Sequence, residues 1–75
     1  MTRPEWIAAF ASLLGTDPPD EATVEMLLEL AGTAAHASER TAAPIACWLV
    51  GRAGLDPSAA MAVAEQVGPS ADEQG

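Results

Sequence analysis

The chain has 75 residues, and its composition and charge exclude several classes of protein. Its net charge of −8, with only three basic side chains, repels phosphate backbones and anionic lipid, so nucleic acid and membrane surfaces are not expected partners. The single cysteine, Cys47, can form neither an intrachain disulfide nor a paired-cysteine zinc site, and an unpaired thiol fits a reducing cytoplasm. Because nothing resembles a signal peptide or a membrane span, we expect a cytoplasmic protein.

The first expected helix has clear signals at both ends. Thr2 and Glu5 have the spacing of a capping box, with Pro4 in the first turn. Gly15 is a typical left-handed C-cap. Large apolar side chains recur between these ends at helical spacing: Trp6, Ile7, Phe10, Leu13 and Leu14. The two prolines in residues 16–19 cannot continue the helix, so this segment is a short loop.

The second expected helix begins after Asp20, a favourable N-cap, and ends near Arg40. Apolar side chains cover more than half of its circumference, which predicts a central place in the fold. Gly32 weakens this helix by roughly 1 kcal/mol relative to Ala and offers room for a neighbouring backbone to come close. A single polar stripe interrupts the apolar surface: Glu25, Glu29, His36 and Arg40.

Residues 41–44 form a joint between the second and third helices. Either Thr41 caps the third helix with Pro44 in its first turn, or that helix begins at Pro44. The third helix is apolar nearly all round and ends around Gly51 and Gly54. Asp56 and Pro57 then form a cap and first-turn pair for a fourth helix. One stripe of that helix is apolar: Ala60, Met61, Val63, Ala64 and Val67.

These elements predict an all-α fold, a compact bundle-like domain of four helices with short loops over residues 1–69, followed by a disordered acidic tail over residues 70–75. The short first loop favours an antiparallel arrangement of the first two helices. The tight joint at residues 41–44 favours a sharp angle between the second and third helices.

The polar groups do not form a recognisable catalytic or metal site. Glu29 and His36 are seven residues apart, roughly 10 Å along a helix axis, which is too far for both to bind one ion. The serines and Cys47 have no identifiable base and orienting acid, and no phosphate-binding glycine motif is present. We therefore expect no enzyme activity and no cofactor, with the polar stripe a solvated face or part of a binding surface.

The tryptophans allow two interpretations. Trp6 and Trp48 are both core residues, because a domain poor in aromatic residues needs their area, or one of them is exposed and anchors a partner. Trp48 shares a helical stripe with Ile45 and Arg52. The candidate interaction or joint residues are therefore the polar pair at the end of the second helix and the residues that follow it: His36, Arg40, Pro44, Trp48 and Arg52.

Small size, acidity and helix count also resemble an acyl carrier protein. Such carriers present a serine directly after an aspartate at the start of their second helix, where a phosphopantetheine arm is attached. The nearest match is Asp56, Pro57 and Ser58, in which a proline separates the pair and the site precedes the last helix. This interpretation stays a weaker alternative.

Residues 6–54 resemble a small bacterial domain of unknown function that occurs alone or attached to MobA-like molybdenum cofactor guanylyltransferases. The resemblance follows an ordered set of motifs: Trp6, Leu14 and Gly15, residues 27–31, Ala35 and His36, Arg40, Ala42 to Pro44, and residues 49–51. It implies an accessory or interaction role near molybdenum cofactor maturation and supplies no catalytic residue. No nucleotidyltransferase domain is present in the chain.

The functional expectation is a non-catalytic protein-interaction module with a protein partner, a nucleotidyltransferase of cofactor biosynthesis being the partner that the resemblance implies. The alternative is self-association into a homodimer through the apolar third helix, with the acidic groups outside. His36 and Arg40 then either hold the joint by bonding backbone carbonyls or belong to a docking patch.

Overall fold

The computed structural model describes residues 1–67, and the expected acidic tail lies outside the described residues. The described part contains four helices and no strand, which confirms the all-α fold class. In chain order the helices are α1 (Arg3–Leu14), α2 (Glu21–Ala37), α3 (Ala42–Ala53) and α4 (Pro57–Val67). No helix among these is long and apolar enough to cross a membrane.

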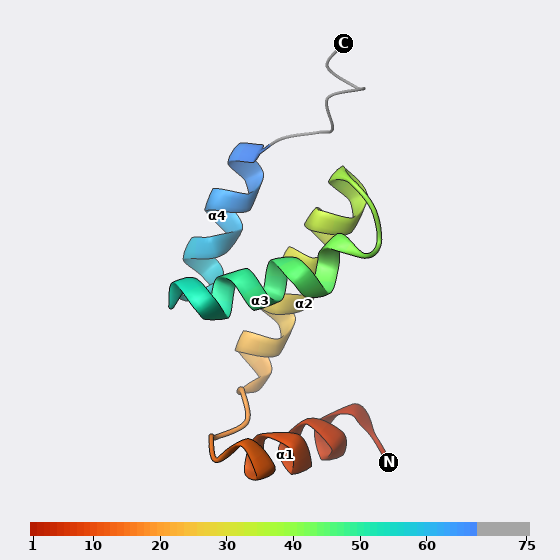
Figure 1. Cartoon of the computed structure of the whole chain (residues 1–75), viewed down its shortest axis with the longest axis vertical. Helices are drawn as coiled ribbons and strands as arrows, with labels where there is room; N and C mark the ends of the chain where they lie inside the picture. The colour runs from red at the N-terminus through yellow and green to blue at the C-terminus, as the bar shows by residue number, and fades with distance from the viewer. Residues whose placement is uncertain (68–75) are drawn as a thin grey trace.

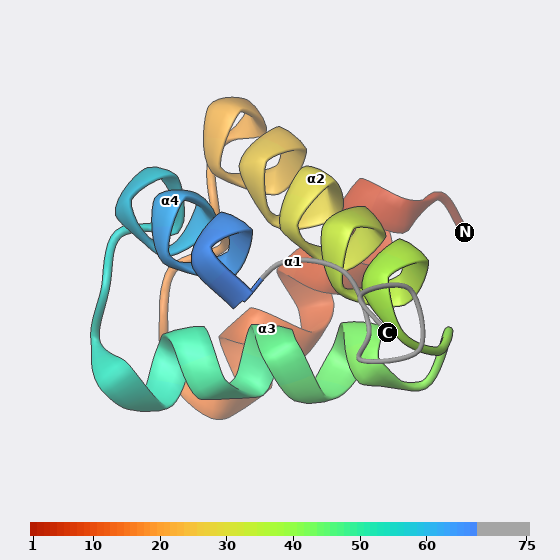
Figure 2. The same ribbon diagram turned by 90° about the horizontal axis from the view of Figure 1, so that it is seen from above.

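Helix α2 is the centre of the fold, as its broad apolar surface predicts. It packs against both α3 and α4, and α3 crosses it at a steep angle, as expected from the tight joint (Figures 1 and 2). Leu30 of α2, which is 2% exposed, is the best-buried large side chain. The Thr33 hydroxyl also donates to the Met61 sulfur at 3.8 Å, joining α2 to α4.

Helix α1 lies at one end of the molecule, across the direction of α2 (Figure 1). The expectation that α1 and α2 run antiparallel is therefore wrong. The physical reason lies in the loop, because Pro18 and Pro19 continue in an extended path after Gly15 and do not turn the chain back along α1. Ala11 is the one buried residue of α1, so this helix has most of its surface free.

The helix ends mostly follow the expected signals. Thr2 and Glu5 form a complete capping box, and Gly15 is left-handed with a φ of 80°. The Asp20 carboxylate accepts a bond from the Thr23 N–H at 2.8 Å. Of the two alternatives for the third helix, the structure shows the first: α3 begins at Ala42 with Thr41 at the N-cap. The Thr41 side chain makes no capping bond. Gly51 lies within α3, which ends only before the left-handed Gly54.

The second helix is shorter than expected, because it ends at Ala37 and not near Arg40. The Ser38 hydroxyl bonds the Ala34 carbonyl at 2.8 Å and its backbone leaves the helical region, so local side-chain bonding stops the helix here. Arg40 consequently lies in the turn before α3 and not one helical turn beyond His36. The turn itself is closed by backbone bonds from Ala42 N–H to Glu39 O and from Ala43 N–H to Arg40 O.

The core is thin for a chain of this length. Within the described part only Ala11, Leu30 and Ala60 are buried, and two of these three have a single methyl as side chain. Gly32 does not bring a neighbouring backbone close, since a Cβ added there would meet nothing within 4 Å. Many large apolar side chains are instead more than two fifths exposed.

Candidate functional site

The largest apolar side chains form two exposed stripes, one on α1 and one on α3. On α1 the stripe falls within about 100° of the helix circumference, beside the buried Ala11. On α3 the exposed residues lie opposite the half-buried positions that face α2. We call these two stripes the α1–α3 face, and its six residues are Trp6, Phe10, Leu13, Leu14, Ile45 and Trp48.

Both tryptophans belong to this face and neither is a core residue. Trp6 is 54% exposed and Trp48 is 63% exposed, so the core interpretation of these residues is wrong. On α1 the rings of Trp6 and Phe10 lie 5.1 Å apart at an angle of 35°, one helical turn from each other. Tryptophan is one of the residues most enriched among the anchors of protein interfaces.

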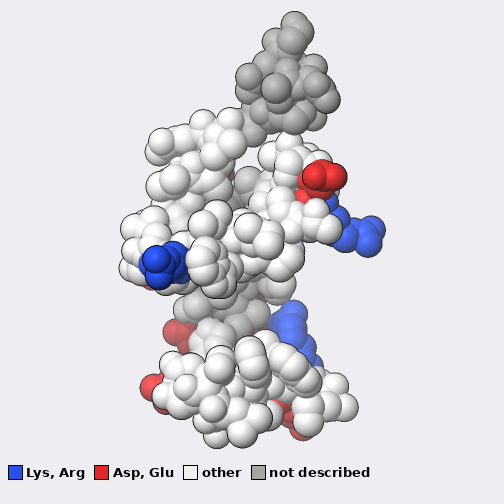
Figure 3. All heavy atoms as spheres, in the orientation of Figure 1, with Lys and Arg blue, Asp and Glu red and all other residues white. Residues whose placement is uncertain are grey.

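The α1–α3 face is poor in charge. Arg3 and Glu5 are the charged residues of α1, and Arg52 is the only one of α3. In Figure 3 the near side over these two helices is mostly white, with blue and red groups at its margins. The chain carries −8 in total and the two helices +1 between them, so the rest of the chain carries −9.

The candidate residues from the sequence are all exposed, but the structure does not bring them together in one cluster. Pro44, Trp48 and Arg52 follow one another at four-residue intervals along the outer side of α3. His36 lies in the last turn of α2, on the exposed side that also carries Glu25 and Glu29. Within residues 1–67, neither His36 nor Arg40 donates a side-chain bond to a backbone carbonyl at the joint.

Phe10 and Leu13 are binding-face candidates that sequence reasoning missed. Apolar residues occur on more than half of α1, and the sequence does not show which side of the helix faces the rest of the molecule. Trp6, Phe10 and Leu13 stand at positions i, i+4 and i+7, a spacing that places them on one face of the helix and that helices docking in a groove also use.

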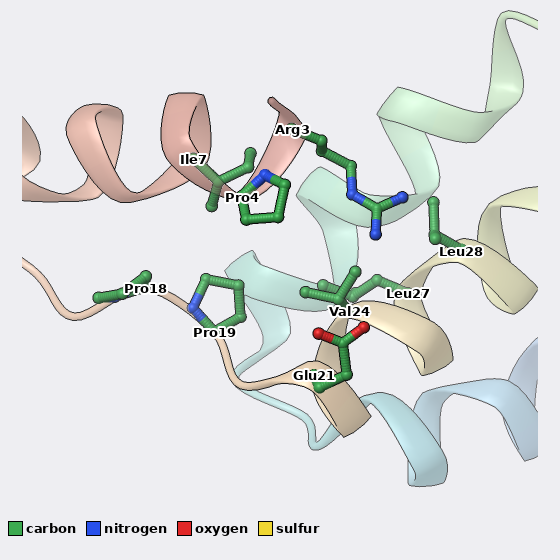
Figure 4. A pocket seen from close by; sticks show the side chains of 9 residues that line it. All are labelled: Arg3, Pro4, Ile7, Pro18, Pro19, Glu21, Val24, Leu27 and Leu28. Atoms are coloured by element: carbon green, nitrogen blue, oxygen red, sulfur yellow. The ribbon is translucent and has the colours of Figure 1, made fainter. Parts of the chain in front are cut away.

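An open cleft of about 350 Å³ separates the start of α1 from the start of α2. Figure 4 shows its side chains, with the Arg3 guanidinium reaching across toward α2 and the Glu21 carboxylate on the opposite wall. Seven of the nine lining residues are apolar, and none is a serine, cysteine or histidine. The cleft therefore offers apolar contact and two charged groups, Arg3 and Glu21. The nine residues are Arg3, Pro4, Ile7, Pro18, Pro19, Glu21, Val24, Leu27 and Leu28.

A second open groove, of about 330 Å³, lies between α2, α3 and α4 and is lined only by apolar residues, among them Leu30, Leu49, Val50, Val63 and Val67. Residues 1–67 contain no group of three or more histidine, cysteine, aspartate or glutamate side chains arranged to hold a metal ion. Cys47 is half-buried in α3. The second groove therefore offers apolar contact area.

Asp56 and Ser58, the pair that resembles a carrier site, have a structural role in the fold. The Asp56 carboxylate accepts bonds from the Ser58 hydroxyl and from the Ser58 N–H, the latter at 3.0 Å. These two bonds hold the pKa of Asp56 below its usual value. This geometry is that of an N-cap, so Asp56 and Ser58 stabilise the start of α4.

Comparison with known families matches residues 2–74 to a family described as "Domain of unknown function (DUF6457)". Because the match spans nearly the whole chain, the protein belongs to this family. The expected resemblance to a small domain of unknown function is thereby confirmed. Neither a curated protein nor a solved structure matches the chain.

Proposed function

We propose that this protein is a non-catalytic protein-interaction module whose contact surface is the α1–α3 face. One observation supports the proposal above the others: Trp6 and Trp48 are both more than half exposed, on helices that carry almost no charge. Exposed apolar patches that are rimmed by polar groups mark interaction sites on soluble proteins. Removing this apolar surface from water is favourable, so a complex in which a partner covers the face is stabilised by the burial.

We further propose that the module serves molybdenum cofactor biosynthesis, as an accessory to a guanylyltransferase of that pathway. The support is the ordered set of motifs from Trp6 to Gly51, which resembles domains attached to such enzymes. A domain attached to an enzyme in one protein is a natural partner of that enzyme when the two are separate chains. An acyl-carrier role is the weaker alternative, and a mass increase after incubation with a phosphopantetheinyl transferase would support it.

The test is a calorimetric titration of the chain into a purified MobA-like guanylyltransferase. Binding that is weakened at least tenfold by Trp48→Ala and left unchanged by Val63→Ala, a change at an exposed apolar residue of α4, supports both the module and its partner. Binding that is lost in Val63→Ala and kept in Trp48→Ala moves the contact to the groove between α2, α3 and α4 and overturns the assignment of the α1–α3 face. Absence of binding removes the guanylyltransferase as partner.

A further inference from the structure

We infer that the α1–α3 face is the interface of a symmetric homodimer, with a second copy of this chain as its occupant. This inference rests on the proposed interaction function and assigns the α1–α3 face to a second copy of the chain in place of the guanylyltransferase. Three independent properties of the molecule support it: the apolar area of the face, the thin core of one copy, and the uneven distribution of charge.

The exposed area of the face matches what a stable dimer needs. Its six residues expose between 48% and 89% of their surface. If a side chain of this size offers about 200 Å² when fully exposed, the six together expose roughly 750 Å² of apolar surface. A standard stable interface buries about 800 Å² on each partner, so this face alone nearly supplies one side of it.

The core of a single copy is small for a chain of this length, so burial of further apolar surface against a second copy would add to its stability. Leu30 is the only large side chain among the three buried ones. Domains of about 70 residues or fewer usually add disulfides, a metal or oligomerisation to such a core, and a chain with one cysteine forms no internal disulfide. Burial of α1 by a second copy is especially favourable, because Ala11 is the only residue of this helix that is buried within one copy.

The distribution of charge favours a second copy over a basic protein as the occupant of the α1–α3 face. The acidic excess of −9 lies outside α1 and α3, so a basic partner is attracted to the other surfaces of the molecule. The face itself carries close to zero charge. Two copies that meet through it keep their carboxylates at the margins and outside, where repulsion between them is screened by salt.

Two-fold symmetry lets each stripe find a partner. A symmetric dimer is self-complementary, so residue i of one copy contacts residue j of the other, and j contacts i. In this arrangement α1 of each copy packs on α3 of its partner, and the stripe that contains Trp6 covers the stripe that contains Trp48. Contact between the two α1 helices alone leaves both α3 stripes exposed.

The test is the molar mass of the full chain by sedimentation equilibrium at low and high protein concentration. We expect the mass of a dimer at high concentration, and Trp48→Glu weakens the dimer at least about a hundredfold, as expected for a tryptophan at the centre of an interface. Ala62→Glu adds the same charge on the outer side of α4 and leaves the dimer unchanged. Helix content by circular dichroism confirms that both variants fold.

Three outcomes overturn the inference. If the chain stays monomeric at every concentration and binds the guanylyltransferase through Trp48, the homodimer is wrong and the proposed interaction function is supported. A dimer that Ala62→Glu dissociates as strongly as Trp48→Glu does not use the α1–α3 face. If the chain is a folded monomer and does not bind the guanylyltransferase, both the homodimer and the proposed function are contradicted.

Discussion

The rings of Trp6 and Phe10 lie 5.1 Å apart on the outer side of α1, in contact with each other and with solvent. This tilted pair is local to one helix, because Ala11 is the only residue of α1 that is buried. A ring pair of this kind stabilises a helix weakly in water. The two aromatic groups therefore lie side by side on the α1–α3 face.

Replacing Phe10 by alanine tests how local this pair is. We expect the free energy of unfolding to fall by at most about 1.5 kcal/mol, since the lost ring is half exposed and its partner ring belongs to the same helix. Urea unfolding measures the loss, and the near-ultraviolet circular dichroism of Trp6 weakens in parallel. The measurement belongs in a Trp48→Glu background, where association makes no contribution. A loss of about 3 kcal/mol or more indicates that α1 is packed into the core.

Leu30 is the residue whose loss is expected to damage the fold most. Leu30→Ala removes a side chain that is 2% exposed and lies where α2 packs against its neighbours, and we expect a loss of about 2–5 kcal/mol in the free energy of unfolding. Because small domains have only a few kcal/mol of stability, the variant is partly or wholly unfolded at room temperature.

Leu28 is the matched control for Leu30, two residues away on the same helix and 52% exposed. Leu28→Ala is expected to cost less than about 1 kcal/mol, because half of that side chain already contacts water. Both variants are compared by urea unfolding monitored at the helix signal. Equal losses at the two positions contradict the burial pattern described for α2.

Local signals in the sequence were sufficient to predict the elements of the fold. Capping bonds and left-handed glycines depend on residues within one turn, so the ends at Thr2, Gly15, Asp20 and Gly54 followed directly. The end of α2 at Ala37 could not be predicted in this way, because a serine that bonds back to the helix is common in both helices and turns.

The α1–α3 face was predicted only in part, because it depends on tertiary packing. A chain with apolar residues on most sides of α1 and α3 does not reveal which side a neighbour covers. Trp48 was a candidate from its stripe with Ile45 and Arg52, whereas the place of Phe10 required the direction of α1 relative to α2. That direction is set by the extended loop at Pro18 and Pro19.

Two glycines are expected to respond to alanine in opposite ways. Gly15 has a φ of 80°, where an L-residue with a Cβ is strained, so Gly15→Ala costs about 1–2 kcal/mol of stability. Gly32 is inside α2, and an added Cβ meets nothing within 4 Å, so Gly32→Ala stabilises the protein by about 0.5–1 kcal/mol. Thermal unfolding of the two variants beside the natural chain measures both. A destabilised Gly32→Ala variant shows that a backbone or partner packs closely there.

His36 and Arg40 are expected to contribute little to stability, since both are exposed and the joint is closed by backbone bonds. His36→Ala and Arg40→Ala should each change the free energy of unfolding by less than about 0.5 kcal/mol. Their effect on binding to a guanylyltransferase is the informative measurement, because a docking role lowers affinity without a change in stability. A loss of stability above about 1 kcal/mol in either variant restores the hypothesis that the side chain holds the joint.

The two aspartate caps predict that stability falls in acid. Hydrogen bonds from the Thr23 hydroxyl and N–H lower the pKa of Asp20, and those from the Ser58 hydroxyl and N–H lower the pKa of Asp56. A carboxyl whose pKa is lower in the folded state stabilises the fold at pH values above its unfolded pKa. This stabilisation is lost as the pH falls through the folded pKa, that is, below about pH 4. Urea unfolding at a series of pH values from neutral to acid follows the loss.

Asparagine is the matched replacement for these caps, because it also accepts the capping bond and carries no proton to titrate in this range. In Asp20→Asn combined with Asp56→Asn, we expect helix content close to that of the natural chain at neutral pH and a shallower decline of stability below about pH 4. Glu25→Gln, on the exposed side of α2, is the control for removal of a charge without a cap. An acid transition that is identical in the double variant and in the natural chain means that other carboxylates, and not the caps of α2 and α4, set the pH dependence.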